Sequence, residues 1–223
     1  MQAYAPILAA LTLIIVGLLF VYVFAVRPWH TRWGATHLDV IARLPGDAVS
    51  PRSSAQVTHA INIEAPPETI WPWLMQIGQE RGGFYSYTFL ENLIGCDMHD
   101  TRRIVPEWQH RTVGDTVWLA TPKRFKGQAR MVVAVVDPPR ALVLSTPADW
   151  KRRQALDEGL DTTWEFALQP KPGGATRLLA RMRVEAYPSA WRRLINFLFW
   201  EPAHFLMERK MLLTIKQLSE RGF

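Results

Sequence analysis

The sequence has no charged residue before Arg27, so all 26 basic and 20 acidic side chains lie in the part of the chain that follows. It has one cysteine, Cys96, which excludes an intrachain disulfide, a CxxC redox pair and a thiolate zinc cluster. A reducing compartment is therefore the simplest location. Apolar residues make up 48% of the chain, which excludes wholesale disorder, and 223 residues fit one ordinary domain with an appendage.

Long basic runs are also absent, although the net charge is +6. The basic residues lie singly or in pairs, such as Arg102-Arg103 and Arg192-Arg193, and no recognised nucleic-acid-binding motif accompanies them. We therefore expect no nucleic-acid partner. A weak attraction to anionic lipid headgroups fits this charge better.

The uncharged segment from Ile7 to Val26 is 20 residues long. At a rise of about 1.5 Å per residue, a helix of this length spans about 30 Å, the thickness of the hydrocarbon core of a bilayer. A cleaved signal peptide is the alternative, but it would carry basic residues before the apolar run, and Met1 to Pro6 has none. The segment therefore predicts a transmembrane anchor.

Basic residues follow the apolar segment, at Arg27 and Arg32, and none precedes it. Because an excess of Lys and Arg marks the cytoplasmic flank of a membrane helix, we expect a single-pass protein of the inner (cytoplasmic) membrane with a cytoplasmic C-terminal domain. Trp29 and Trp33 fit an interfacial aromatic belt at this end, or they pack against the domain. Both arrangements can hold at once.

Composition divides the chain into three parts. Residues 1–32 form the anchor and its flank. Residues 33–55 contain two clusters of turn formers and small polar residues, Leu44 to Asp47 and Ser50 to Ser54, and predict a linker or a strap on the surface. Residues 56–223 form the folded domain.

Alternation of apolar and polar residues predicts strands in the folded domain. In the last of them the apolar side chains share one face, while Arg177, Arg181 and Arg183 share the other. We therefore expect one face of the sheet to be core and the other to be wet. The expected strands cover residues 57–64, 116–120, 129–136, 141–145, 162–168 and 177–186.

Helical spacing of apolar residues predicts two short helices, at 70–77 and 88–94, and one long C-terminal helix. Ser189 is the expected cap of the long helix, Arg221 its end, and Pro202 the site of a kink. The fold class is α+β, in which an antiparallel sheet wraps around the long C-terminal helix and leaves a cavity between them.

Short motifs in a fixed order resemble those of the START-like helix-grip superfamily, also called SRPBCC, which includes polyketide cyclases and lipid-transfer domains. The chain looks like a bacterial branch of this superfamily with an added N-terminal anchor. The resemblance covers roughly residues 33–220, and it implies a hydrophobic ligand held between the sheet and the long helix. The motifs are Ala65-Pro66-Pro67-Glu68, Ile70-Trp71-Pro72-Trp73-Leu74, Arg81-Gly82-Gly83-Phe84-Tyr85-Ser86-Tyr87, Leu90-Glu91-Asn92, Arg103-Ile104-Val105-Pro106-Glu107, Val113-Gly114-Asp115-Thr116-Val117, Asp137-Pro138-Pro139-Arg140-Ala141-Leu142-Val143-Leu144, Thr163-Trp164-Glu165-Phe166 and Thr176-Arg177-Leu178-Leu179.

The chain has ten Trp residues, and core packing accounts for most of them. Aromatic and Met-lined walls are also what an apolar pocket requires. The side chains expected to line such a pocket are Tyr85, Trp118, Trp164, Phe166, Met182 and Phe205.

If the protein is an enzyme, His99, Asp100 and Glu107 are the candidate general acid and base, because they form a polar cluster between the second helix and the next strand. A loop-ordering ion pair between Arg103 and Glu107 is the favoured alternative, since adjacent residues rarely aim at one point. No catalytic set of the superfamily maps onto this sequence.

Two Glu-x-x-His spacings occur, at Glu107 with His110 and at Glu201 with His204, and such pairs on helices are typical of di-iron sites. The first pair precedes a strand, Pro202 disturbs the second, and no further bridging glutamates are available. We expect no metal and no cofactor.

The sequence thus predicts a membrane-anchored domain that binds a hydrophobic small molecule or lipid, rather than an enzyme. One alternative is an enzyme of the cyclase or dehydratase type acting on an apolar or polyketide-like substrate. Another is a protein-interaction module whose Arg-rich sheet face docks an acidic partner, and the sequence identifies no such partner.

Overall fold

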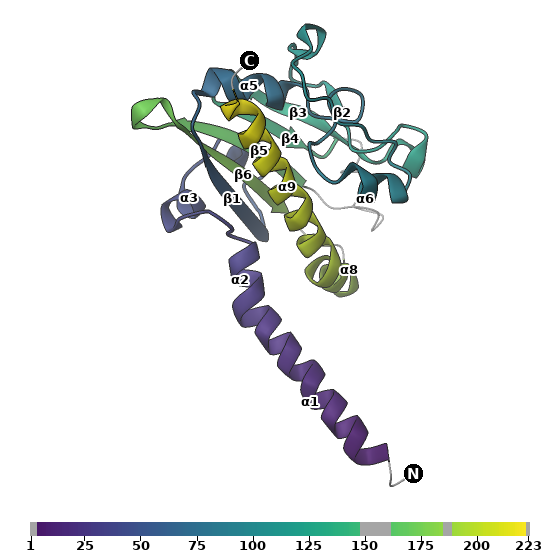
Figure 1. Ribbon diagram of the computed structural model, residues 1–223. Helices are drawn as coiled ribbons and strands as arrows, with labels where there is room; N and C mark the ends of the chain where they lie inside the picture. Colours follow the sequence, from purple (N-terminus) through teal and green to yellow (C-terminus); the bar gives the residue numbers. More distant parts are fainter. Residues whose placement is uncertain (1–3, 148–161, 185–188, 222–223) are drawn as a thin grey trace.

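The computed structural model describes residues 4–147, 162–184 and 189–221. Its strands form a six-stranded antiparallel sheet in the order β1-β6-β5-β4-β3-β2, so the first strand of the chain pairs with the last (Figure 1). Each predicted strand has a counterpart, although positions 185 and 186 of the last lie outside the described residues. The strands are β1 (Ala55–Ile63), β2 (Thr116–Trp118), β3 (Arg130–Asp137), β4 (Ala141–Ser145), β5 (Thr162–Pro170) and β6 (Thr176–Val184).

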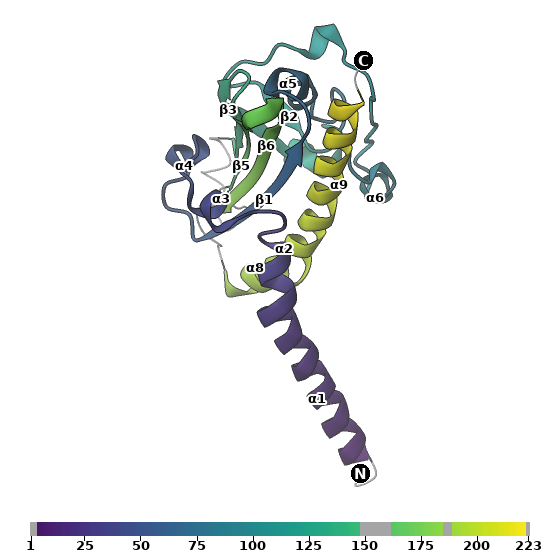
Figure 2. The same cartoon turned by 60° about the vertical axis from the view of Figure 1, so that its left-hand side comes forward.

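One long helical segment crosses a face of the sheet (Figures 1 and 2). It begins at Ser189, whose Oγ accepts a hydrogen bond from the Arg192 backbone N at 3.3 Å, as the sequence predicts. The segment comprises α8 (Ala190–Ile195), a π-helical turn η6 (Asn196–Trp200) and α9 (Glu201–Glu220). The π turn falls directly before Pro202, where the sequence predicts a kink, because proline has no N–H to continue the regular hydrogen bonding. The sheet and this helix together confirm the helix-grip α+β fold.

The main core lies between the sheet, α9 and α5 (Pro67–Met75). Large side chains such as Trp73 and Phe166 are fully buried there, and the rings of Trp73 and Tyr85 meet edge to face with centroids 5.9 Å apart. The predicted helix at 88–94 is α6 (Thr88–Leu93). The remaining short helices in the described loops are η3 (Pro106–Trp108), η4 (Arg124–Gly127) and η5 (Pro172–Gly174).

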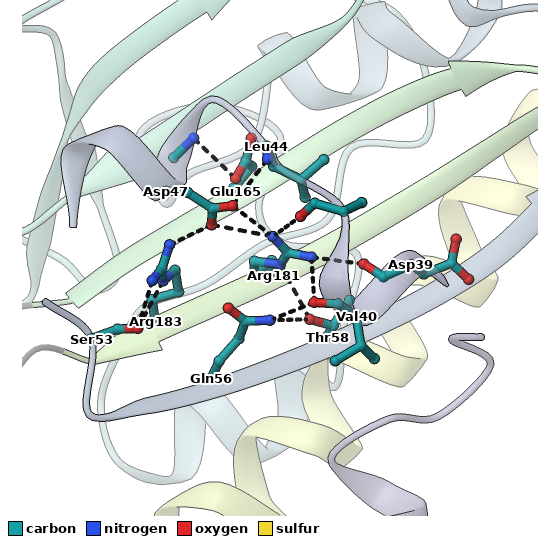
Figure 3. Close-up of polar contacts among 12 residues, drawn as sticks. Asp39, Val40, Leu44, Asp47, Ser53, Gln56, Thr58, Glu165, Arg181 and Arg183 are labelled. Atoms are coloured by element: carbon teal, nitrogen blue, oxygen red, sulfur yellow. Dashed lines mark hydrogen bonds and ion pairs between the residues drawn. The ribbon is translucent and has the colours of Figure 1, made fainter. Parts of the chain in front are cut away.

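The opposite face of the sheet is covered by residues 34–54, which we call the strap and which contain α3 (His37–Ile41) and α4 (Gly46–Val49). Arg181 lies under the strap with 1% of its surface exposed (Figure 3). Its guanidinium donates to the carbonyls of Ala42 at 2.8 Å and Asp39 at 2.7 Å, and to the Asp47 carboxylate at 3.0 Å.

The prediction of a wet Arg-rich face is therefore wrong for β6. Arg183 also binds Asp47, at 2.5 Å, and Arg177 binds Asp39, at 2.5 Å. Alternation shows only which residues share a face of a strand. It does not show that another segment of the same chain covers that face and supplies the carboxylates and carbonyls that arginine needs.

The N-terminal helix extends away from the domain as α1 (Ala5–Val21), η2 (Tyr22–Val26) and α2 (Arg27–His30) (Figures 1 and 2). Its segment Ile7–His30 is long and apolar enough to cross a membrane, and none of its most apolar window is buried inside the protein.

The domain end of this helix is fastened to the start of the C-terminal helical segment. The Tyr22 hydroxyl donates to the Phe197 carbonyl at 2.6 Å, and Arg27 forms a two-point ion pair with Glu201 at 2.9 and 3.1 Å. The ring of Trp29 packs edge-on against Phe205 while more than half of its surface stays exposed. The position of the apolar helix is thereby tied to the long helix that grips the sheet.

Candidate functional site

A cavity of about 280 Å³ lies between the sheet and α9, and we call it the Met-lined cavity. Its wall is mostly apolar, with four methionines, and four polar side chains reach it. A second cavity of about 420 Å³, the strand-end cavity, shares Leu119, Met182, Trp200 and His204 with the first. The Met-lined cavity is lined by Phe84, Ser86, Glu91, Leu119, Met131, Trp164, Met182, Trp200, Ala203, His204, Met207, Glu208 and Met211.

The strand-end cavity lies where β1 and β5 begin and β6 ends, next to η6. It is lined by Gln56 and Val57 of β1, Thr162 of β5 and Val184 of β6, and on the helix side by Asn196 and Glu201. It therefore lies close to the junction with the N-terminal helix, which Glu201 also contacts.

Two of the six predicted lining residues, Trp164 and Met182, lie on the Met-lined cavity, where they are direct partners across β5 and β6. Tyr85, Phe166 and Phe205 are buried in the packed interior instead. Trp118 lies at the far edge of the sheet, with the Arg130 guanidinium 5.9 Å from its ring centroid. Alternation placed Phe166 on the correct face, but it cannot tell which residue of a face borders a cavity.

The predicted acid–base cluster does not meet the cavity. His99 and Glu107 are exposed, and Glu107 lies on η3. Asp100 is half-buried, and its Oδ1 accepts a hydrogen bond from the Tyr85 backbone N at 3.1 Å, so it orders the loop that precedes α6. Within the described residues, no three His, Cys, Asp or Glu side chains gather as metal ligands.

Glu208 is the most deeply buried acidic group at the cavity, with 2% of its surface exposed. Its Oε1 accepts a hydrogen bond from Trp164 Nε1 at 2.5 Å and lies 3.4 Å from His204 Nε2, while its Oε2 contacts His59 Nδ1. The other nitrogen of His59 lies 2.7 Å from the His30 carbonyl oxygen. Since that oxygen can only accept, His59 Nε2 carries a proton.

Burial alone would raise the pKa of Glu208, but His204 and His59 hold that pKa well below its ordinary value. Glu208 is therefore ionised at neutral pH, and its carboxylate is shared among Trp164, His204 and His59. The result is a buried ion pair that fixes the indole of Trp164 as a rigid wall of the cavity.

Glu91 is the other acidic side chain at this cavity, and it comes from α6. Its Oε2 is buried and has no hydrogen-bond partner among the described residues. Burial, reinforced by the negative charge of Asp100, raises the pKa of Glu91 to about 7. At neutral pH this carboxyl therefore exchanges its proton readily.

Sequence reasoning missed Glu91, His59 and Glu208, although two of them gave a signal. Glu208 falls at helical spacing with Phe205, Leu212 and Ile215, so it is an acidic residue on the apolar face of α9. His59 likewise shares the inward side of β1 with apolar neighbours. A polar group on a buried face needs a partner, and these two partner each other.

No protein-family model matches the sequence, and no curated protein matches it. Among solved structures, it is similar to truncated norcoclaurine synthase from Thalictrum flavum, with 14% identity over 74% of this chain and 92% of that one and a TM-score of 0.42. It is also similar to protein MLL2253 from Mesorhizobium loti, with 17% identity over 76% and 99% and a TM-score of 0.40. The Aha1 dimer from Colwellia psychrerythraea gives 18% identity over 75% and 98%, also with a TM-score of 0.40.

Because these TM-scores are low, the similar structures do not indicate a ligand or an activity for this protein. The fold assignment stands on this structure itself, through its strand order and the long helix across the sheet. At the level of fold, the chain has the START-like helix-grip arrangement that its sequence motifs indicate.

Proposed function

We propose that this protein is a membrane-anchored START-like domain that binds a hydrophobic small molecule or lipid between the sheet and α9. The observation that carries the proposal is the Met-lined cavity, an apolar space of about 280 Å³ on which a few polar groups converge. Removing apolar ligand surface from water yields about 25 cal/mol per Å², so a ligand that fills the cavity is held without any charged contact.

The composition of the wall suits ligands of irregular shape. Met131, Met207 and Met211 have flexible, polarisable side chains that adapt to what they touch. Trp164 is a fixed part of the same wall, because its indole N–H is held by Glu208 and its ring stacks on Phe84 at 5.7 Å. The cavity thus combines a rigid aromatic surface with adaptable methionine side chains.

The layout of the chain supports a position at the membrane. In this proposal residues 1–32 are the anchor, residues 33–55 the linker that contains the strap, and residues 56–223 the ligand-binding domain. The anchor crosses the inner membrane once, and Arg27 and Arg32 keep the domain on the cytoplasmic side. A tether of this kind holds the cavity within tens of Å of the lipid surface and raises the local concentration of lipid-soluble ligands.

A second apolar surface beside the anchor supports the same position. The segment α8–η6 exposes a row of large apolar side chains, and Arg192 and Arg193 lie next to them. In both views this segment lies at the end of the domain where the anchor joins (Figures 1 and 2). Such a pattern suits the interface of an anionic bilayer, where apolar groups enter the acyl region and basic groups meet headgroups. The exposed apolar residues are Trp191, Leu194, Leu198, Phe199 and Trp200.

We expect residue 199 to lie in the bilayer interface. A polarity-sensitive fluorophore is attached to the full chain at Phe199→Cys, in vesicles of phosphatidylcholine and phosphatidylglycerol. It should emit at a shorter wavelength than the same fluorophore at the control position, and lipid-borne nitroxide should quench it more strongly. The control is Phe89→Cys on α6, since both phenylalanines are well exposed and native Cys96 is buried. Equal emission and quenching at the two positions would contradict this placement.

Ligand binding in the cavity is tested by filling it. In the Ala203→Trp variant an indole ring occupies the Met-lined cavity, so binding of naphthalene to the full chain in phosphatidylcholine nanodiscs should fall below detection. The midpoint of unfolding should not fall, because the new ring fills empty space. The matched control is Leu206→Trp, which adds the same ring on the outward face of α9, where Leu206 is 56% exposed. Saturation-transfer NMR reports the binding, and naphthalene signals that are equal in both variants would overturn the proposal.

An enzyme of the cyclase or dehydratase type remains the second candidate, and Glu91 is the observation that favours it. A carboxyl with a pKa of about 7 inside an apolar cavity is suited to general acid–base chemistry at neutral pH. If this alternative holds, Glu91→Gln abolishes turnover of an apolar substrate but leaves its binding intact. The third alternative, a protein-interaction module, needs the Arg-rich face of the sheet as its docking surface. The strap covers that face, so the alternative is not supported.

A further inference from the structure

In the described part of this basic protein, the two cavities are lined by acidic residues rather than by Lys or Arg. The net charge is +6, yet no Lys or Arg lines either cavity in the described part of the chain, whereas three glutamates do. The basic side chain that an anionic ligand would meet on these walls is His204, which already approaches Glu208 at 3.4 Å. Acidic side chains therefore outnumber basic ones on these walls, although the chain as a whole is positively charged.

Two of the three glutamates already have cationic or donor partners. Glu201 is paired with Arg27 at 2.9 Å, and Glu208 is held by Trp164, His59 and His204. These two groups need nothing more from a ligand.

Glu91 differs, because its buried Oε2 has no hydrogen-bond partner among the described residues. The charged groups around it do not neutralise it. Asp100 adds negative charge, and the Cys96 thiol is influenced by both Glu91 and Arg124. The Arg124 guanidinium donates to the Ile94 carbonyl at 2.9 Å. The basic neighbours Arg102, His99 and Lys210 act on Asp100, while His204 on the same cavity approaches Glu208.

We propose that the ligand is a lipophilic cation, with an apolar ring or short chain against the methionines and Trp164 and an ammonium group that donates to Glu91. This inference rests on the proposed function and names its ligand class. An ammonium supplies the donor and the positive charge that this wall lacks, and hydrogen bonds between ionised groups are the stronger kind. A fatty acid or another carboxylate would place a second negative charge beside Glu91 and is rejected.

The test compares three probes that share one apolar body, 2-(1-naphthyl)ethylamine, 2-(1-naphthyl)ethanol and 1-naphthylacetate, on the full chain in phosphatidylcholine nanodiscs. The amine should bind about tenfold more tightly than the alcohol, and the acetate most weakly. Amine affinity should rise between pH 6 and pH 8, because Glu91 loses its proton around pH 7 while the amine stays charged. Alcohol affinity should not change with pH.

The Glu91→Gln variant should lose the preference, so that the amine binds no more tightly than the alcohol. Glu68→Gln, which removes an exposed carboxylate on α5, is the matched control and should keep the preference. Naphthalene binding should be the same in both variants, which shows that the cavity is intact. A parallel titration with dihexanoyl phosphatidylethanolamine compares the affinity of an ammonium in a lipid headgroup with that of the free amine. It shows which of the two is the source of the cation.

The outcomes separate this inference from the proposed function. If naphthalene binds and the amine has no advantage over the alcohol, or if Glu91→Gln keeps the advantage, the ligand class is wrong while the cavity function stands. If naphthalene does not bind to the wild type, both are overturned.

Discussion

Replacing Glu208 by leucine is expected to lower the free energy of unfolding by about 3–5 kcal/mol, because it leaves one partner of a buried ion pair without its counter-charge. In the variant, the fully buried His59 loses its carboxylate partner, and Trp164 Nε1 loses its hydrogen-bond acceptor. Urea unfolding of the full chain in mild detergent measures the loss. The control on the same helix is Glu220→Leu, since Glu220 is exposed and its replacement should cost less than about 1 kcal/mol.

The same variant tests the charge state of the pair. The pKa of Glu208 is depressed by His204 and His59 against the effect of burial, so its contribution to stability is complete above the ordinary carboxyl pKa of 4.5. This contribution is lost as the pH falls through the lower pKa of the folded state. Wild-type stability should therefore fall in acid more steeply than that of Glu208→Leu. A loss below about 1 kcal/mol at neutral pH, or parallel pH profiles, would contradict the buried ion pair.

Replacing Arg181 by methionine is expected to release the strap and to cost about 3–5 kcal/mol of unfolding free energy. Arg181 is 1% exposed and donates to Asp47 and to the carbonyls of Ala42, Asp39 and Val40, all of which belong to the strap. Methionine fills the volume but satisfies none of these acceptors. Hydrogen exchange of residues 34–54 should rise by orders of magnitude, while exchange in α9 rises much less.

The control for Arg181 is Arg140→Met. Arg140 has an exposed side chain, and its contact with Asp137 is long, at 3.8 Å, so the change should stay within about 0.5 kcal/mol. Unchanged exchange of the strap in Arg181→Met would show that the apolar contacts of Leu44 and Leu179 hold the strap without the arginine.

The strands and the long helix followed from the sequence because each has a face that must be buried, and burial leaves a periodic pattern. Leu178, Ala180 and Met182 of β6 point to the helix side as expected, and Ser189 caps α8 as expected. The prediction of an exposed Arg181 failed because the alternation of residues along β6 does not show which segment covers the face of the sheet away from α9.

The candidate site was harder to predict for a different reason. Trp164 borders the cavity and Phe166 does not, yet they are two residues apart on the same strand face. Phe166 is covered completely by the main core, whereas Trp164 also borders the space beside α9, and this difference depends on long-range packing rather than on local periodicity. Glu91 lies on a six-residue helix, which is too short to show a clear apolar stripe.

The central claim is that the space between the sheet and α9 holds an apolar molecule. Native mass spectrometry of the full-length wild type, purified from its membrane in mild detergent beside Ala203→Trp and Leu206→Trp, tests it most directly. We predict a bound small molecule on the wild type and on Leu206→Trp, and none on Ala203→Trp. A wild type that carries no such molecule and takes up no naphthalene, or an Ala203→Trp variant that carries the same molecule as the wild type, would contradict the claim.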